Sequence, residues 1–464
     1  MSLELELTFD KEVRYAKSMQ FWQFAILVLL AIACSISEIL IAVCWSFIFI
    51  TTIVAFAKND TSNVWYCIAA SPAMEVWARM SRAPMVPDEI GKYYLVLATT
   101  VLLLHNLRNK VHFPAHRAGK ILLLVLLPSV VVHLATFNYD RWVFNGLGMI
   151  ELVLLLSLTA IERWDVEKFC KALQYAFYPI IGMLVFTTMK TPTYDNIDFR
   201  LNANNTGGFG SNQVATLLGV GILLLTILMV LKRPFVSFKP LNYLLIAYLL
   251  FKGMLTFSRG GMFVPAVAVI VMFLPGMMTN ARSFLRYTLL LVALFVTGFL
   301  VFQKVNSMTG NNLLYRYRGE TRGTLDRTKE KSWNSVTSGR VDIVASDWMI
   351  FKDNPIFGVG IGNSGPERYK YGVEPIVAHT EFSRMLSEQG IWGAGTAIGL
   401  LAFAFAWVLR QRLNTWRGVT GALFTLAILT TFHAAMRTNT ASVFYALAAI
   451  PVYYRKQEQG DEEE

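Results

Sequence analysis

Residues 337–393 read TSGRVDIVASDWMIFKDNPIFGVGIGNSGPERYKYGVEPIVAHTEFSRMLSEQGIWG and belong to the one long hydrophilic segment of an otherwise apolar chain. The stretch holds a Ser-Gly-Arg motif that ends in Arg340, a G-x-G-x-G cluster and one histidine, His379. Pro375 before the histidine and Gly390 after it are typical start and stop signals of a helix. We therefore expect a folded polar insertion. The apolar segments on either side of it determine the overall fold.

The composition of the chain is typical of a membrane protein. Of its 464 residues, 55% are apolar and 16% are charged, whereas a soluble domain is usually ~45–50% apolar and ~25% charged. The N-terminal segment is too charged for a cleavable signal peptide, and no small-residue cleavage site follows the first apolar run. We expect an integral membrane protein whose first helix is its own insertion signal.

Apolar segments along the chain have the length that crossing a hydrocarbon layer requires, ~20 residues. The weakest is 64–82, which contains Pro72, Glu75, Arg79 and Arg82 and suits a tilted, kinked or interfacial helix. The pattern predicts an all-α polytopic membrane protein with about 12–14 transmembrane helices. The segments are 20–36, 38–57, 64–82, 90–107, 118–137, 142–161, 167–187, 213–231, 239–257, 261–279, 284–303, 389–410, 417–434 and 438–454.

Basic residues in the short loops give the orientation. The net charge is +11, and much of it lies in the loops 108–120, 232–239, 282–286 and 410–417. An even number of predicted spans separates these loops, so they share one side, which the positive-inside rule assigns to the cytoplasm. Both termini are then cytoplasmic and the long loop 304–388 is periplasmic. No basic stretch is long enough to follow a nucleic-acid backbone, so we expect no nucleic-acid binding.

The same parity favours three crossings ahead of residue 88, or one crossing with a re-entrant pair. It divides the chain into an N-terminal transmembrane region, 1–303, a periplasmic loop subdomain, 304–388, and a C-terminal transmembrane region with a cytoplasmic tail, 389–464.

The four cysteines all lie in or beside apolar segments. This placement indicates neither a disulfide framework nor a C-x-x-C metal site.

Polar residues that carry chemistry gather on the predicted external face. Arg200 and Asn212 flank the start of one span, and Arg259 lies between two spans in the sequence FSRGG. Arginine near a bilayer is costly and is usually paired or functional, although Arg259 could also anchor a helix end at the interface. Guanidinium groups suit phosphate, and nearby glycines let backbone approach a ligand. The arginines favour a site for a lipid diphosphate, while Asn212 supplies a polar contact or a helix cap.

His379 is the candidate for proton transfer. It is predicted near a helix N-terminus, where the helix dipole disfavours imidazolium, and a neutral imidazole can accept a proton as a general base. A lone histidine is more often a structural hydrogen-bonder, so the residues alone leave both roles open. The other histidines form no H-x-x-x-H ligand pair, and the chain has no P-loop. We expect neither a metal nor another cofactor.

The order of these motifs resembles the O-antigen ligase and polymerase superfamily. Ser-Gly-Arg with Trp348 after it, a proline, the glycine cluster and an Ala-His ahead of a helix follow one another as in that family. Arg200, Arg259, Arg340 and His379 match family positions. The residue after the histidine is usually Asn or Ser in the family and is Thr380 here.

The resemblance implies a GT-C-like glycosyltransferase of the bacterial inner membrane with its active site facing the periplasm. It implies transfer of the O-antigen glycan from undecaprenyl diphosphate to lipid A-core by a metal-independent inverting reaction. In that family, two external arginines, here Arg200 and Arg259, and the loop histidine, here His379, are essential. The expected roles are diphosphate binding for the arginines and general base for the histidine. Secondary candidates are Arg340, Asn212 and Glu381.

Other functions remain open on the sequence alone. An O-antigen polymerase uses the same chemistry with a lipid-linked acceptor, but it is expected to have two sizeable periplasmic loops, and 188–212 is short, which favours the ligase. A protein O-oligosaccharyltransferase is a third possibility. A transporter of a lipid-linked sugar should have ionisable residues deep in its spans and two matching halves. Only Glu38 and Glu151 are deep carboxylates, and the halves do not match.

Overall fold

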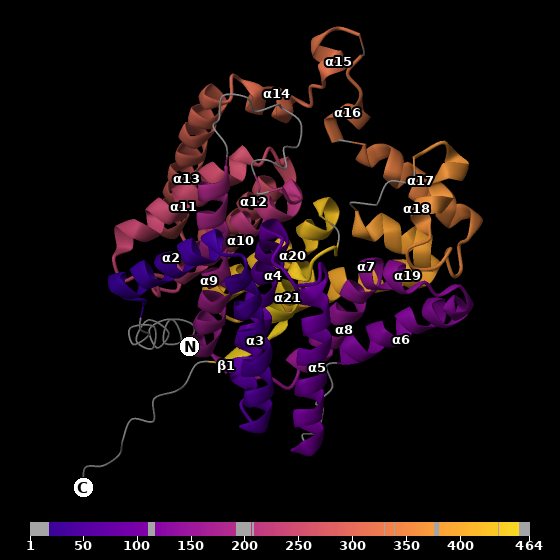
Figure 1. Cartoon of the computed structure of the whole chain (residues 1–464), viewed down its shortest axis with the longest axis horizontal. Helices are drawn as coiled ribbons and strands as arrows, with labels where there is room; N and C mark the ends of the chain where they lie inside the picture. Colours follow the sequence, from indigo (N-terminus) through magenta and orange to yellow (C-terminus); the bar gives the residue numbers. More distant parts are fainter. Residues whose placement is uncertain are drawn as a thin grey trace.

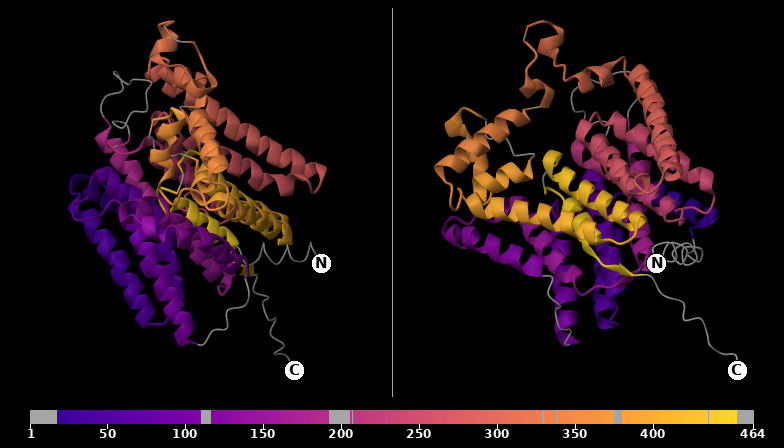
Figure 2. Two further views of the ribbon diagram at one scale, coloured as in Figure 1. Left: turned by 90° about the vertical axis from the view of Figure 1, so that its right-hand side faces the viewer. Right: turned by 180° about the vertical axis from the view of Figure 1, so that it is seen from behind.

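The computed structural model consists almost entirely of helices that pack into one bundle, with α14 to α16 along its upper edge and α17 and α18 at its right-hand side in Figure 1. The segment of α14 to α16 also forms the top of the molecule in both views of Figure 2. The structure describes residues 18–109, 117–191, 206, 208–328, 330–337, 339–374, 380–434 and 436–453. The helices are α2 (Phe21–Ile36), α3 (Ile39–Ala57), α4 (Thr61–Ser81), α5 (Ile90–Arg108), α6 (Arg117–Val132), α7 (Tyr139–Asn145), α8 (Leu147–Thr159), α9 (Val166–Lys190), α10 (Ser211–Val230), α11 (Lys239–Leu255), α12 (Arg259–Met277), α13 (Ala281–Met308), α14 (Asn312–Arg318), α15 (Arg322–Leu325), α16 (Trp333–Thr337), α17 (Arg340–Asp353), α18 (Ser364–Glu367), α19 (Glu381–Arg410), α20 (Asn414–His433) and α21 (Thr440–Ala449). Two short 3-10 helices, η2 (Leu134–Thr136) and η5 (Arg368–Tyr371), and a parallel pair of two-residue strands, β1 (Trp164–Asp165) and β2 (Val452–Tyr453), complete the described elements.

The predicted all-α polytopic membrane fold is confirmed. Within the described residues, seven helices are long and apolar enough to cross a membrane, and the pair α7 and α8, bent by 52°, raises this to eight. Three more apolar helices, in α2, α6 and α21, are shorter. Every apolar segment predicted from the sequence contains a helix.

The helix α4, predicted as the weakest span, lies inside the bundle. Its residues from Val64 to Ser81 are almost all buried. The charge of Glu75 is satisfied there, because Glu75 pairs with Arg79 at 3.3 Å and accepts a hydrogen bond from the Asn439 backbone N–H at 3.3 Å. Neighbouring helices thus supply the hydrogen-bond and ion-pair partners that lipid lacks, so a polar helix can lie in the centre of a membrane protein.

Backbone contacts join helix ends that lie far apart in the sequence. Met19, before α2, forms backbone hydrogen bonds of 3.0 and 2.9 Å with residues 235 and 237, before α11. Strand β1 pairs with β2, in the register Trp164 to Val452. The segments around Met19, residues 235–237 and β1 are predicted to be cytoplasmic, and β2 lies at the end of the predicted span 438–454. Three helices, α2 to α4, lie ahead of residue 88, and of these α3 has the length and apolar character of a full span.

The helix α19 runs across the predicted stop at Gly390. The chain kinks there (φ 61°, ψ −141°) and continues directly as the next apolar helix. A Cβ at Gly390 would lie 2.5 Å from the Pro355 carbonyl oxygen, which also accepts the Ile391 N–H at 2.9 Å. The kink is therefore set by packing of the long loop against α19. Pro375, the predicted start signal, lies outside the described residues, and the described helix begins at Glu381.

Candidate functional site

The turn between α11 and α12 holds Arg259 at the first position of a helix. Phe257 takes a left-handed conformation (φ 59°), and Ser258 caps α12 by accepting the Gly261 N–H at 3.4 Å. The Ser258 hydroxyl also donates to the Asn212 side-chain oxygen at 2.8 Å. Asn212 lies in the first turn of α10, after the N-cap, and does not cap that helix. Its role is to fix the turn that carries Arg259.

The glycines of the FSRGG sequence bring helices together. A Cβ at Gly260 would lie 2.7 Å from the His433 ring at the end of α20, and one at Gly261 would lie 2.3 Å from the Ala215 side chain on α10. At these two positions the close approach is between helices, whereas the sequence suggested an approach to a ligand. The packing fixes the position of Arg259 relative to α10 and α20.

Two arginines from the long loop converge on Arg259. Arg316 of α14 donates to the Phe257 carbonyl oxygen at 3.3 Å, and Arg340 of α17 donates to the His433 carbonyl oxygen at 3.2 Å. We call Arg259, Arg316 and Arg340 the arginine cluster.

The electrostatics of the arginine cluster favour an anion. Burial, followed by the charges of Arg259 and Arg340, lowers the pKa of Arg316 to about 10. Burial and the charge of Arg259 also lower the pKa of Arg340. Neither Arg316 nor Arg340 forms an ion pair with a carboxylate in the described part of the chain. A bound anion would relieve this repulsion.

An apolar groove leads away from the arginine cluster. It has a volume of about 430 Å³ and lies between α10, α11, α12 and α13, with Arg259 and Tyr317 among its lining residues. The rest of its lining is almost all apolar. Phe263 and Phe295, which line it, are 65% and 74% exposed, so the groove opens on the outer surface of the helices. An apolar groove with a cationic end suits an amphiphile with an anionic head group.

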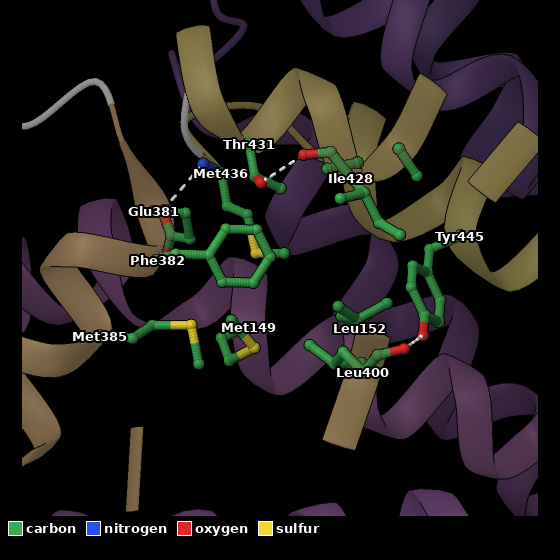
Figure 3. Close-up of a pocket in the computed structure, with 12 residues that line it drawn as sticks. Met149, Leu152, Glu381, Phe382, Met385, Leu400, Ile428, Thr431, Met436 and Tyr445 are labelled. Carbon is green, nitrogen blue, oxygen red and sulfur yellow. Dashed lines mark hydrogen bonds between the residues drawn. The ribbon is translucent and has the colours of Figure 1, made fainter. Parts of the chain in front are cut away.

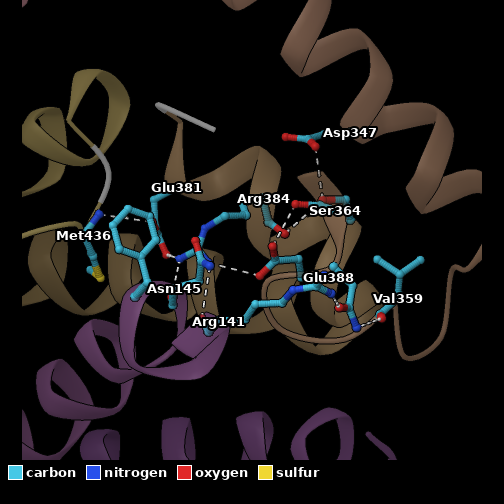
Figure 4. A network of polar contacts seen from close by, with 12 residues as sticks. Arg141, Asn145, Asp347, Val359, Ser364, Glu381, Arg384, Glu388 and Met436 are labelled. Carbon is cyan, nitrogen blue, oxygen red and sulfur yellow. Dashed lines mark hydrogen bonds and ion pairs between the residues drawn. The ribbon is translucent and has the colours of Figure 1, made fainter. Parts of the chain in front are cut away.

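The first turns of α19 are held by a buried polar network (Figure 4). Arg384 donates to Glu381, to Glu388 at 3.1 Å and to the Asn145 carbonyl oxygen at 2.5 Å. Glu388 also accepts a hydrogen bond from Ser364 at 2.7 Å. The network ties α19 to α7 on one side and to α18 of the long loop on the other.

Glu381 is an anchor in this network. Its side chain accepts the Met436 N–H at 3.1 Å, and Glu381 is only 1% exposed. Figure 3 shows Phe382, Met385 and Met149 below it, around a cavity of about 10 Å³. That volume is about enough for one water molecule and not for a sugar. The start of α19 is thereby fixed to the turn between α20 and α21.

The long loop is also held to α19 by a buried ion pair. Arg368 of η5 pairs with Asp347 of α17 at 2.6 Å, and both side chains are fully buried. The Ser383 hydroxyl of α19 donates to Asp347 at 2.7 Å. Burial raises the pKa of Asp347, and the charge of Arg368 opposes this shift.

The glycine cluster shapes the loop where it touches the membrane helices. Gly358, Gly360 and Gly362 all have positive φ, at 70°, 89° and 79°. A Cβ at Gly358 would lie 2.4 Å from the Gln389 backbone nitrogen, and one at Gly362 would lie 2.7 Å from the Arg141 Cβ. Only glycine fits these positions without displacement. The cluster forms a turn that packs on α19 and α7.

The predicted site residues fall into three groups. Arg200 and His379 lie outside the described residues. Arg259 and Arg340 come together, with Asn212 in support, whereas Glu381 is part of the separate network at the start of α19. The sequence analysis missed Arg316 and Tyr317, whose only signal is the aromatic and basic alternation YRYR at 315–318. The described residues contain no group of three or more His, Cys, Asp or Glu that could hold a metal ion.

Comparison with known proteins identifies one family. No curated protein matches the chain. Residues 244–398 match the family model described as O-antigen ligase. The match contains Arg259, Arg316 and Arg340, the long loop and the first half of α19. Through this segment the chain is similar to the family of O-antigen ligases.

Proposed function

We propose that the protein is an O-antigen ligase, which transfers O-antigen glycan from undecaprenyl diphosphate to lipid A-core on the periplasmic face of the bacterial inner membrane, in a GT-C-like fold. The observation that carries the proposal is the apolar groove that ends at the arginine cluster. The groove takes the polyprenyl tail, and the arginines bind the diphosphate. Neither a nucleotide nor a simple phosphate would need both features.

The charges of the head group match the cluster. A diphosphate offers several oxygens to the forked guanidinium of Arg259 and to those of Arg316 and Arg340. Arg200 is proposed as a further ligand of the diphosphate, on the ground of the family resemblance. Each charge-assisted hydrogen bond contributes about 1.5–3 kcal/mol. The contribution grows as negative charge builds up on the leaving diphosphate.

The reaction is a single inverting displacement. The acceptor hydroxyl oxygen attacks the anomeric carbon of the donor glycan and forms the new C–O bond. The bond between that carbon and the phosphate oxygen breaks, and the lipid diphosphate leaves with the electron pair. The imidazole of His379 takes the proton of the hydroxyl as general base. The mechanism requires no nucleophilic side chain of the protein, no metal and no other cofactor.

Glu381 supports this step as a positioning residue. It is two residues from His379, buried, and already engaged by Arg384 and the Met436 N–H. A carboxylate held in this way fixes the helix start next to the histidine. It is therefore a poorer base than the imidazole.

The test is transfer by the purified protein in lipid nanodiscs, with lipid-diphosphate-linked glycan as donor and lipid A-core as acceptor. The substitution Arg259→Ala should reduce kcat/KM about 10- to 150-fold, the equivalent of about 1.5–3 kcal/mol. Arg259→Lys should recover little of this, since an ammonium lacks the fork. The matched control is Arg286→Ala, which removes an exposed arginine from the first turns of α13, outside the arginine cluster and the groove lining. Equal activity of all these variants would contradict the proposal.

The polymerase alternative gives a different result in cells. In a deletion strain, loss of the whole lipopolysaccharide ladder with accumulation of lipid-linked polymer identifies a ligase. Core bearing a single repeat unit identifies a polymerase. Transfer to a protein acceptor in the purified system would instead identify an O-oligosaccharyltransferase.

A further inference from the structure

A second cavity lies beside α7, which the buried polar network ties to the start of α19. It has a volume of about 360 Å³, within the ~300–1,000 Å³ range of small-molecule sites. Its walls come from the residues just before α5, from α5 itself and from α7. Its lining combines two phenols and a phenyl ring with two carboxylates and a guanidinium, from Tyr93, Tyr139, Phe144, Glu89, Asp140 and Arg141.

We propose that this cavity is a saccharide subsite that holds a sugar of the acceptor. The inference rests on the proposed function and deepens it. Charges of both signs line the cavity, so it does not select an anion as the arginine cluster does. Hydroxyl groups of a sugar can donate to Glu89 and Asp140 and accept from Arg141. The aromatic rings offer faces for the apolar C–H side of a sugar ring.

The lining is accessible yet held in place. Tyr139 is 59% exposed, and Asp140 and Arg141 are also exposed. Arg141 is fixed by a 2.6 Å hydrogen bond to the Asn363 side-chain oxygen of the long loop. The end of α7 is fixed by Lys92, whose ammonium donates to the carbonyl oxygens of residues 143 and 144 at 2.9 and 2.8 Å. A site that keeps its shape without ligand loses less entropy on binding.

The inner wall of the cavity reaches the start of α19, because Asn145 of its lining accepts a hydrogen bond from Arg384. The ring centroid of Phe144 is 5.9 Å from the guanidinium carbon of Arg437. Arg437 follows Met436, whose N–H binds Glu381, two residues from His379. On the other side of the same turn, the His433 carbonyl oxygen binds Arg340 of the arginine cluster. The turn between α20 and α21 thus lies between the arginine cluster and this cavity.

This arrangement suits a displacement. An inverting reaction needs the acceptor hydroxyl to approach the anomeric carbon from the side opposite the leaving diphosphate. A sugar in the cavity would approach Glu381 and the turn between α20 and α21 from the α7 side. The donor glycan, bound through its diphosphate at Arg259, extends from the other side.

The experiment measures KM separately for the two substrates in the purified protein. Tyr139→Ala should raise the acceptor KM about 2- to 10-fold, the range for loss of a neutral hydrogen bond, and Asp140→Asn should raise it by up to about 150-fold, the range for loss of a charge-assisted one. The donor KM and kcat should stay unchanged. Tyr369→Ala, which removes a 77% exposed tyrosine of the long loop outside the cavity, is the matched control. An unchanged acceptor KM, or a rise in the donor KM instead, would overturn the assignment.

A binding measurement separates this inference from the proposed function. Deacylated core oligosaccharide is added to the wild-type protein, and contact is detected by saturation-transfer NMR, which needs no turnover. A signal that is lost in Tyr139→Ala and kept in Tyr369→Ala supports the subsite even if transfer fails. Equal signals in both variants rule it out. Tyr139→Phe, which keeps the ring, gives an intermediate result and guards against misfolding of the alanine variant.

Discussion

The substitution Arg316→Gln separates the binding role of the arginine cluster from a structural one. Arg316 is held by one hydrogen bond, at 3.3 Å, to the Phe257 carbonyl oxygen, which a glutamine amide can also make. Burial and the charges of Arg259 and Arg340 lower its pKa from 12.5 to about 10. This shift sets an upper limit of ~3 kcal/mol on the cost of the charge in the empty protein, reduced by solvent screening of a partly exposed group.

The variant should therefore change stability and binding in different ways. Removing the charge relieves repulsion, while replacing the guanidinium weakens a hydrogen bond by about 0.5–1.5 kcal/mol. These two effects oppose each other, so we expect the thermal stability of the empty protein to stay the same or to rise. Binding of a short-chain polyprenyl diphosphate should weaken about 10- to 150-fold, because one charge-assisted contact is lost.

The assay measures both quantities on one sample in nanodiscs. Thermal unfolding gives the stability, and isothermal titration with the polyprenyl diphosphate gives Kd at low and high salt. Added salt should narrow the difference between variant and wild type, because it screens the charge. Lower thermal stability with an unchanged Kd would refute the reasoning and make Arg316 a structural residue.

Three further predictions follow from the site and the loop. His379→Ala should reduce the rate of transfer by about 10²–10⁴-fold, and His379→Gln should not restore it. Wild-type activity should fall as pH is lowered, because imidazolium cannot accept a proton, and it should survive EDTA. A folded His379→Ala protein with near-wild-type rates would place the base elsewhere. Asp347→Asn leaves the buried Arg368 without its ion pair and should destabilise the protein by about 3–5 kcal/mol in chemical unfolding, whereas Asp347→Leu with Arg368→Met should lose much less; equal losses would show that the charges are not the cause. A single cysteine in place of the exposed Tyr369 should react with an impermeant thiol reagent in cells with a permeabilised outer membrane, and reaction only after inner-membrane lysis would invert the topology.

The sequence by itself determined which segments form helices and which of these helices and loops carry the charged groups. A run of apolar residues is a local property of the sequence. In lipid, such a run forms a helix because the helix pairs all of its backbone N–H and C=O groups within the segment. The segments predicted as spans therefore contain helices, including α4 despite Glu75 and Arg79. The position of Arg259 at a helix start and the turn at the glycine cluster also follow from local signals.

Only the tertiary structure decided which polar residues act together. Arg316 and Arg340 lie 57 and 81 positions after Arg259 in the sequence (316 − 259 and 340 − 259), and no local pattern brings them to it. Glu381 could have been a base on sequence grounds, and its burial against Met436 makes it an anchor. The groove likewise needs four helices at once. Such sites depend on contacts between distant segments, which packing of the whole chain selects and which the composition of any one segment does not specify.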